Sequence, residues 1–224
     1  MASSSTRPSG VPWDYDRVEL IADGVIHALG VGLGLAGAFA LVILAASSFR
    51  AADILAVAIY SIGLISMLGL SAAYNLWPVS RTKWMLRRFD HSAIYVMIAG
   101  TFTPFIAQMK FGIVSVTLLA GVWLAAAAGI ALKLALPGRF DRLAVALYLL
   151  LGWIGAAAYA LVPITLPTLS LWLLAAGGAL YSAGVIFHAW QSLRFQNVIW
   201  HGFVLVAACC HYSAVLDCVV LART

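Results

Sequence analysis

Seven long apolar runs make up most of this chain, and only short segments connect them. The runs cover residues 24–46, 53–77, 91–108, 112–136, 143–162, 167–189 and 198–221. A transmembrane helix needs about 20 mostly apolar residues, so each run has roughly the length of one membrane crossing. The short connections indicate one compact bundle without an appended domain. The sequence therefore predicts an all-α integral membrane bundle of seven transmembrane helices.

The scarcity of charge excludes the soluble alternatives. Only 9% of the 224 residues are charged and 64% are apolar, whereas an ordinary soluble domain carries roughly 25% charged residues. Such a chain cannot cover a water-facing surface, which excludes a soluble enzyme, a nucleic-acid-binding protein, a secreted disulfide scaffold and a disordered protein. Cys209, Cys210 and Cys218 lie in the last apolar run without a CxxC spacing, so we interpret them as buried thiols.

The basic residues predict the orientation of the bundle. With the N-terminus in the cytoplasm, ten of the 13 Lys and Arg residues fall on the cytoplasmic side, and Arg50, Lys110 and Arg223 fall outside. The positive-inside rule then places the C-terminus outside. Residues 1–18 contain no apolar segment of a signal peptide, so we expect a cytosolic tail ahead of a transmembrane domain over residues 19–224. A bacterial inner membrane is favoured, with membrane lipids as partners and no nucleic acid.

Polar side chains from three predicted helices converge at one depth near the cytoplasmic side. Ser71 and Asn75 are spaced i,i+4 at the end of the second helix, and Asn197 and His201 are spaced likewise at the start of the seventh. Asp90 opens the third helix at the same level. Ionisable groups are costly in a membrane and usually face the bundle interior, so a polar pocket is predicted. A plain interhelical hydrogen-bond network is favoured for Ser71 alone, and a functional role for Asp90 together with His201.

Five more polar residues lie near this level or deeper. His91 follows the third-helix aspartate, and a functional and a structural role are equally open for it. Asp23 and His27 share one face of the first helix; Glu19 and Asp23 fit an interfacial cap, and His27 needs an interior partner, for which a carboxylate of this set is a candidate. His211 lies ten residues after His201 on the seventh helix, about 15 Å deeper in the membrane. We interpret it as a buried, hydrogen-bonded histidine.

Several motifs of the chain resemble, in order, those of the haemolysin III family. The third-helix signature is matched at 87–105 by RRFDHSAIYVMIAGTFTPF, and the first helix by ELIADGVIHALGVGLGLAG. The second-helix motif is matched by SAAYN, and the sixth and seventh helices by GGALYSAGVIF and VIWHGFVLVAACCHYSAV. This family is related to the adiponectin and progestin receptors and, more remotely, to the alkaline ceramidases. The resemblance implies seven transmembrane helices with a cytoplasmic N-terminus, in agreement with the charge count.

The resemblance also implies a zinc site with a specific set of residues. In such families one histidine of the second helix and two of the seventh hold the ion, a third-helix aspartate holds a zinc-bound water, and a serine lies nearby. Asp90 and Ser71 match the aspartate and the serine, which would be catalytic in an enzyme, and His201 matches one ligand. Asn75 and Asn197 stand where the other two histidines are expected.

The two asparagines change the chemistry expected of the pocket. Zinc favours Cys, His and carboxylate ligands, whereas an amide oxygen suits harder cations. We therefore expect a degraded version of the family's zinc site, with loss of tight zinc binding favoured over its retention. A weaker or different metal and a metal-free hydrogen-bond network are the two forms that such a pocket can take.

Three functions follow from these observations. The favoured one is a non-catalytic membrane protein that binds a small lipid or senses the bilayer through the pocket. The alternative is a metal-dependent intramembrane hydrolase of lipid amide or ester bonds, in which metal-bound water near Asp90 and His201 is the nucleophile. The pore-forming activity implied by the family name is the least favoured. A pore-forming toxin is first a soluble protein and inserts later, and nothing in this sequence indicates such a soluble form.

Overall fold

The computed structural model describes residues 15–46, 50–136, 141–161 and 166–223. The regular structure within these ranges is helical throughout, with seven α-helices and a final 3-10 turn. The α-helices are α1 (Arg17–Ala46), α2 (Ala51–Leu76), α3 (Arg81–Ile106), α4 (Ile113–Ala135), α5 (Asp141–Leu161), α6 (Thr168–Ala189) and α7 (Gln196–Val219), and the turn is η2 (Leu221–Arg223). The all-helical prediction is therefore confirmed.

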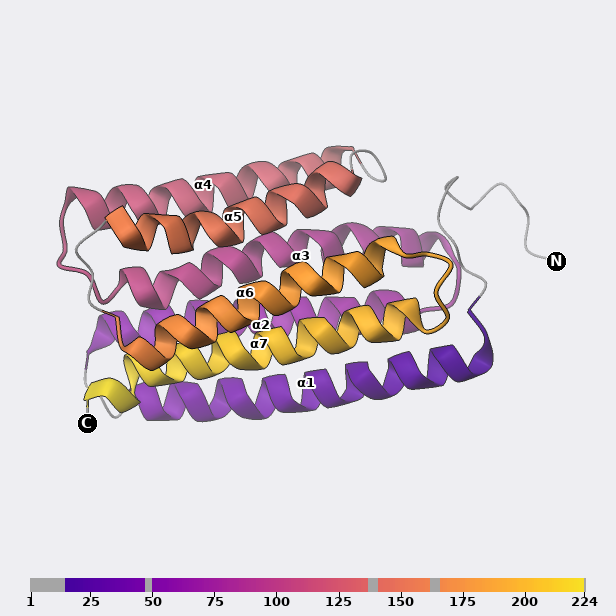
Figure 1. Ribbon diagram of the computed structural model, residues 1–224, viewed down its shortest axis with the longest axis horizontal. Coiled ribbons are helices and arrows are strands. Elements are labelled where there is room, and N and C mark those ends of the chain that lie inside the picture. The colour runs from indigo at the N-terminus through magenta and orange to yellow at the C-terminus, as the bar shows by residue number, and fades with distance from the viewer. Residues whose placement is uncertain (1–14, 47–49, 137–140, 162–165, 224) are drawn as a thin grey trace.

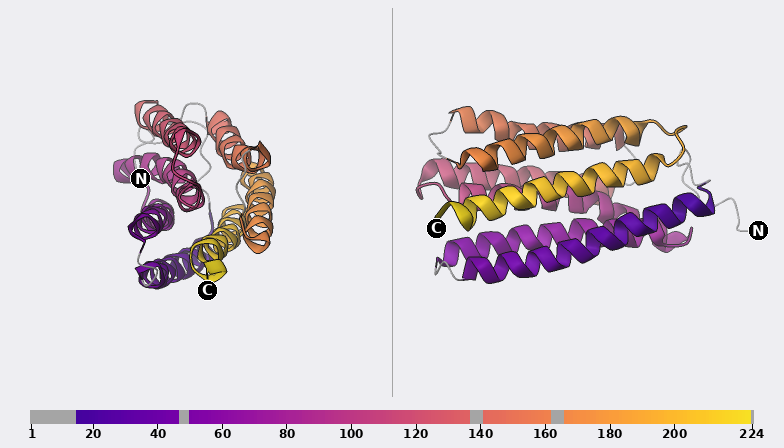
Figure 2. Two further views of the ribbon diagram at one scale, coloured as in Figure 1. Left: turned by 90° about the vertical axis from the view of Figure 1, so that its left-hand side faces the viewer. Right: turned by 60° about the horizontal axis from the view of Figure 1, so that its bottom comes forward.

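The helices run along one common axis and alternate in direction, so consecutive helices are antiparallel (Figure 1). Viewed along that axis, they surround the centre of the bundle (Figure 2). Helix α2 packs along α1 and α3, α6 packs along α7, and α4 packs against α3. Helix α7 also contacts α1, α2 and α3, which closes the bundle between the two ends of the chain. We call the end at which α1, α3 and α7 begin the N-terminal end of the bundle.

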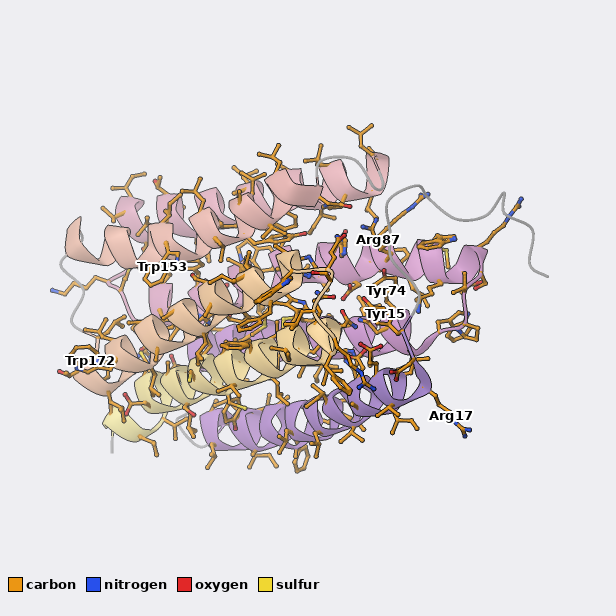
Figure 3. All side chains as sticks on the ribbon, turned by 45° about the vertical axis from the view of Figure 1, so that its right-hand side comes forward. Tyr15, Arg17, Tyr74, Arg87, Trp153 and Trp172 are labelled. Carbon is orange, nitrogen blue, oxygen red and sulfur yellow. The ribbon has the colours of Figure 1, made fainter. Side chains whose placement is uncertain are left out.

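Among the described residues, five helices are long and apolar enough to cross a membrane: α1, α2, α4, α6 and α7. Helix α5 carries a shorter apolar stretch over Leu143–Ile154 within its described part. Large apolar side chains are exposed on the outside of the bundle, among them Phe39 and Trp172 (Figure 3). Such a surface suits contact with lipid chains and not with water, as expected for an integral membrane protein.

Two helices extend beyond the apolar runs. Asp16 caps α1, because its Oδ1 accepts hydrogen bonds from the backbone N–H groups of Val18 and Glu19 at 2.7 and 2.9 Å. Ser80 caps α3 by accepting from the N–H of Lys83 at 3.3 Å. The prediction that Asp90 and His91 open the third helix is wrong; they lie about 2.5 turns after its start. Hydropathy marks only the apolar part of a helix, and capped helices continue into the charged segment.

Small residues let the central helices approach closely. A Cβ atom on Gly63 of α2 would lie 3.3 Å from the Cα of Met97 in α3, and one on Gly100 of α3 would lie 3.4 Å from the carbonyl oxygen of Ile59. Close backbone approach at glycine is the usual packing mode of membrane helices. The core beside these contacts contains fully buried Tyr60. This close packing holds α2 and α3, which carry polar residues at the N-terminal end, against each other.

Candidate functional site

Asp23 lies at the centre of a polar cluster at the N-terminal end of the bundle. Its Oδ1 is 2.6 Å from Nδ1 of His201, and its Oδ2 accepts a hydrogen bond from Nδ2 of Asn197 at 3.1 Å. Nε2 of His27 lies 3.4 Å from the same Oδ2. Asp23, His27 and His201 are all buried. One carboxylate of α1 thus connects both polar residues at the start of α7.

The sequence of α1 explains why Asp23 and His27 face inward. They begin a buried stripe that continues through Gly30, Gly34 and Ala38. The spacing of three and four residues keeps this stripe on one face of the helix. The small residues allow α1 to pack closely against α2 and α7. The side chains of Asp23 and His27 therefore point toward α7, because they lie on the same face of α1 as the small residues that pack against it.

Asn75 joins α2 to the cluster. Its Nδ2 donates to the carbonyl oxygen and to Oγ of Ser71 at 2.9 and 3.3 Å, and its Oδ1 accepts from Nδ2 of Asn197 at 3.3 Å. The same Nδ2 lies 3.5 Å from Nε2 of His201. Because Nδ1 of His201 faces the carboxylate of Asp23, these partners suit a neutral imidazole protonated at Nδ1. The three ligand positions expected from the family resemblance do converge, but two of them meet as amides.

Residues of α3 lie beside this cluster. The side chain of Asp90 interacts with that of Ser71, and both residues line one cavity within the bundle. The ring of His91 meets the ring of Tyr74 edge-on with centroids 6.4 Å apart. The carbonyl oxygen of His91 accepts a hydrogen bond from the hydroxyl of Tyr148 in α5 at 2.9 Å. His91 therefore helps to hold α2, α3 and α5 together near the cluster.

Glu19 fixes the start of α7 against α1. Its Oε1 accepts from the backbone N–H of Phe195 at 2.8 Å, and its Oε2 accepts from that of Asp16 at 2.9 Å. Phe195 precedes α7 in the left-handed conformation, with φ 59. Arg194 donates to Asp16 at 3.0 Å. The backbone hydrogen bond with Glu19, followed by that side-chain hydrogen bond from Arg194, holds the pKa of the Asp16 carboxyl below its usual value.

A cavity of about 1240 Å³ extends from the polar cluster into the bundle, with lining residues from all seven helices. Its N-terminal end is polar and its interior is largely apolar, with Met97 and Phe102 of α3 and Leu174 of α6 among the lining side chains. Tyr15, before α1, also lines it. Burial raises the pKa of Tyr15, and the nearby charges of Asp23 and Glu19 raise it further. Figure 3 shows nitrogen and oxygen atoms gathered near Tyr15, Tyr74 and Arg87 at this end.

A group of charges at the rim of the cavity was not foreseen from the sequence. Asp141, the first residue of α5, accepts from Arg87 of α3 at 2.7 Å and from Lys133 of α4 at 2.6 Å. The two cations are more buried than the carboxylate, with side-chain exposures of 14% and 3% against 38%. The pairing joins residues 54 positions apart for Arg87 and Asp141, so spacing along the chain carries no signal for it.

The structure rearranges the expected groups. Asp23 and His27 were predicted as a second polar set on the first helix, and the structure brings them into one cluster with His201. Glu19 lies at its edge, tied to the start of α7. His211 does not join the cluster: its Nε2 is 3.4 Å from the carbonyl oxygen of Leu174, and its ring packs against that of Tyr181 with centroids 5.5 Å apart. Residues 1–14 of the predicted tail lie outside the described residues, and Arg17 and Val18 already belong to α1.

One group of residues in the described part of the chain has the chemistry of a metal site. Asp23, His27 and His201 each offer one donor atom, and these atoms lie within 4.8 Å of one another. All three side chains are buried. A carboxylate and two imidazoles are ordinary ligands of divalent transition metals. The set Asn75, Asn197 and His201 offers one imidazole and two neutral amides and does not match zinc.

Comparison with known proteins places these features in context. Residues 19–212 match the family model described as haemolysin-III related. The chain is 36% identical over 198 residues to a protein named Hemolysin-3 homolog from Bacillus subtilis (strain 168), covering 88% of this chain and 93% of that protein. It is 33% identical over 198 residues to Hemolysin-3 from Bacillus cereus, covering 88% and 90%. It is also 29% identical over 164 residues to the human Monocyte to macrophage differentiation factor, covering 70% and 67%.

Proposed function

The chain belongs to the haemolysin III family, and from this premise we propose that its bundle binds an amphipathic membrane lipid in the interior cavity. The observation that carries the proposal is the form of that cavity. It holds about 1240 Å³, and away from the N-terminal end its lining is largely apolar, with Thr101, Tyr181 and His211 as polar exceptions. Small-molecule pockets commonly hold about 300–1,000 Å³. The larger volume here suits a ligand with a hydrocarbon chain.

The polar end of the cavity suits the headgroup of such a lipid. Arg87, Asp90, Asn75 and His201 supply a cation, a carboxylate, an amide and an imidazole within one lining. A few polar groups in an otherwise apolar pocket orient a ligand by its polar end. The proposed ligand therefore lies with its headgroup at this end and its chain among residues such as Leu174 of α6.

The proposal includes the topology that this ligand requires. All seven helices cross a bacterial inner membrane, with the N-terminal end of the bundle facing the cytoplasm. The distribution of ten Lys and Arg residues on that side against three on the other supports this orientation. Two of the matched relatives come from bacteria of the genus Bacillus. The polar cluster then lies near the cytoplasmic leaflet, where headgroups enter.

A matched pair of substitutions tests lipid binding. Ile98 of α3 lines the cavity, whereas Ile62 of α2 is 61% exposed on the outside. We expect Ile98→Trp to fill the cavity and to weaken binding of a fluorescent-chain lipid amide by tenfold or more, about 1.4 kcal/mol. Ile62→Trp makes the same chemical change outside the cavity and should leave the affinity unchanged. Equal affinities for the two variants, measured by fluorescence in detergent micelles, would contradict the proposal.

A second candidate function is hydrolysis of a lipid amide or ester at the same polar end. The specific observation in its favour is that Asp90 and Ser71 line one cavity with His27 and His201, two members of the Asp/His/His group. A metal ion bound there would polarise a carbonyl group or activate water. Asp90 and Ser71 would contribute hydrogen bonds and a proton acceptor beside the scissile group. In this case Asp90→Asn abolishes turnover of the fluorescent lipid amide and leaves expression intact; unchanged turnover removes Asp90 from the mechanism.

A further inference from the structure

The geometry points to a zinc site formed by Asp23 and His27 of α1 together with His201 of α7. This set differs from the one that the family resemblance implies, which uses α2 and α7 only. The two sets share His201, and Asn75 of one set and Asp23 of the other lie on opposite edges of its imidazole. In this chain the Nε2 edge faces the amide of Asn75 at 3.5 Å, and the Nδ1 edge faces the carboxylate of Asp23 at 2.6 Å.

The Nε2 edge is a poor place for zinc. The neighbour there is Asn75, whose amide oxygen already accepts a hydrogen bond from the amide of Asn197 at 3.3 Å. Asn75 is further committed to Ser71. Neutral amide oxygens are ligands of hard cations, and zinc selects imidazole, thiolate and carboxylate. The chemistry of the residues on this edge favours a hydrogen-bond network.

The Nδ1 edge offers the donors that zinc selects. One carboxylate and two imidazoles make three protein ligands, the number that zinc sites with an open fourth position use. Two tetrahedral ligands at about 2.1 Å from zinc lie about 3.4 Å apart. The distance between Nε2 of His27 and Oδ2 of Asp23 is already 3.4 Å. The 2.6 Å contact joins the other carboxylate oxygen, Oδ1, to Nδ1 of His201, and this contact must lengthen to admit the ion.

His27 supplies an independent observation. Its Nε2 is buried and has no hydrogen-bond partner among the described residues, although it lies beside the Asp23 carboxylate. A buried polar atom without a partner is costly, and native structures rarely leave one without a reason. Its ring also lies against that of His201, with centroids 4.4 Å apart. A zinc ion between the two rings and the carboxylate would satisfy the free nitrogen.

The surrounding amides support the donors. Nδ2 of Asn197 donates to Oδ2 of Asp23 at 3.1 Å, and this hydrogen bond orients the carboxylate. Neighbours that hydrogen-bond metal ligands fix their geometry and commonly change metal affinity by 10–100-fold. When Nδ1 of His201 binds the ion, its proton resides on Nε2. The amide of Asn75 can serve that tautomer as well, because one end of an amide donates and the other accepts.

Metal titration of the purified full-length protein in detergent tests the site. Elemental analysis after loading and dialysis should find one zinc per chain in the wild type. Asp23→Asn and His27→Ala should each weaken zinc binding by more than about 100-fold, beyond the range of a residue that only orients a ligand. His188→Ala removes an exposed histidine at the same end of the bundle and should keep the ion. Asn75→Ala removes the amide beside Nε2 of His201, so it should weaken zinc binding by no more than about 10–100-fold.

A gain of signal covers the case in which a variant folds poorly. His27→Cys replaces one zinc ligand with another, so it should still bind cobalt(II), now with the near-ultraviolet charge-transfer band of a thiolate ligand. The wild type should show only the visible bands of tetrahedral cobalt. Any one of three results overturns the proposal: a metal-free wild type, one zinc retained in His27→Ala, or loss of zinc in Asn75→Ala as complete as in His27→Ala. Lipid affinity is measured separately, so failure here leaves the cavity proposal standing.

Discussion

The contact between Asp23 and His201 should be worth more than an ordinary hydrogen bond between membrane helices. The perturbation is a double-mutant cycle in metal-free protein, with Asp23→Asn and His201→Gln alone and combined. Asp23→Asn keeps the shape and an acceptor but removes the charge. His201→Gln keeps much of the bulk but removes the donor at the Nδ1 position. Both side chains are less than a tenth exposed, so water replaces neither partner well.

The structure sets the expected magnitude. The Oδ1 to Nδ1 distance of 2.6 Å is that of a charge-assisted hydrogen bond. Hydrogen bonds to charged groups contribute about 1.5–3 kcal/mol to stability. Interhelical hydrogen bonds in a membrane protein average about 0.6 kcal/mol and reach at most about 1.7. Because the acceptor is a carboxylate and both side chains are buried, we expect this pair to behave like a hydrogen bond to a charged group, with a coupling energy of about 1.5–3 kcal/mol.

Unfolding in mixed micelles with increasing SDS fraction measures the four free energies of the cycle. The coupling energy is the part of the double-mutant effect that the two single effects do not explain. Each single variant should lose more than the coupling alone, because each also leaves a buried group without its partner. A coupling below about 1 kcal/mol would refute the reasoning, since the carboxylate would then act as a neutral acceptor.

Two further predictions concern packing and charge. A Cβ on Gly129 of α4 would overlap the ring of Tyr95, whereas one on Gly121 meets nothing within 4 Å. Gly129→Ala should therefore destabilise the bundle by about 1–3 kcal/mol and Gly121→Ala should not, as thermal unfolding in detergent will show; equal midpoints would contradict this packing. Asp141→Asn leaves buried Lys133 without its carboxylate and should destabilise the bundle by about 1–3 kcal/mol. This value is below the range for fully buried pairs because Asp141 is 38% exposed. An unchanged free energy of SDS unfolding would show that solvent already compensates the cation.

The sequence indicated polar residues one helix at a time but not how they connect. The i,i+4 spacings of Asn197 with His201 and of Asp23 with His27 predicted two polar helix faces. The carboxylate that His201 contacts could not be identified, because Asp23 lies 178 positions away and belongs to the first helix. A stronger signal was present: Asp23 and His27 are in register with the Gly30 and Gly34 stripe that packs against neighbouring helices.

The sequence by itself determined that the chain is an all-helical membrane bundle of the haemolysin III family. The length of each apolar run and its scarcity of charge are properties of that segment alone, so they determine that it forms a membrane helix independently of its packing partners. Only the tertiary structure decided which polar residues share one site, because spacing along a helix fixes a face but not its neighbour. The packing of α1 against α7 brings Asp23 and His27 to His201. That contact turns an isolated histidine beside two asparagines into a group with the donors of a metal site.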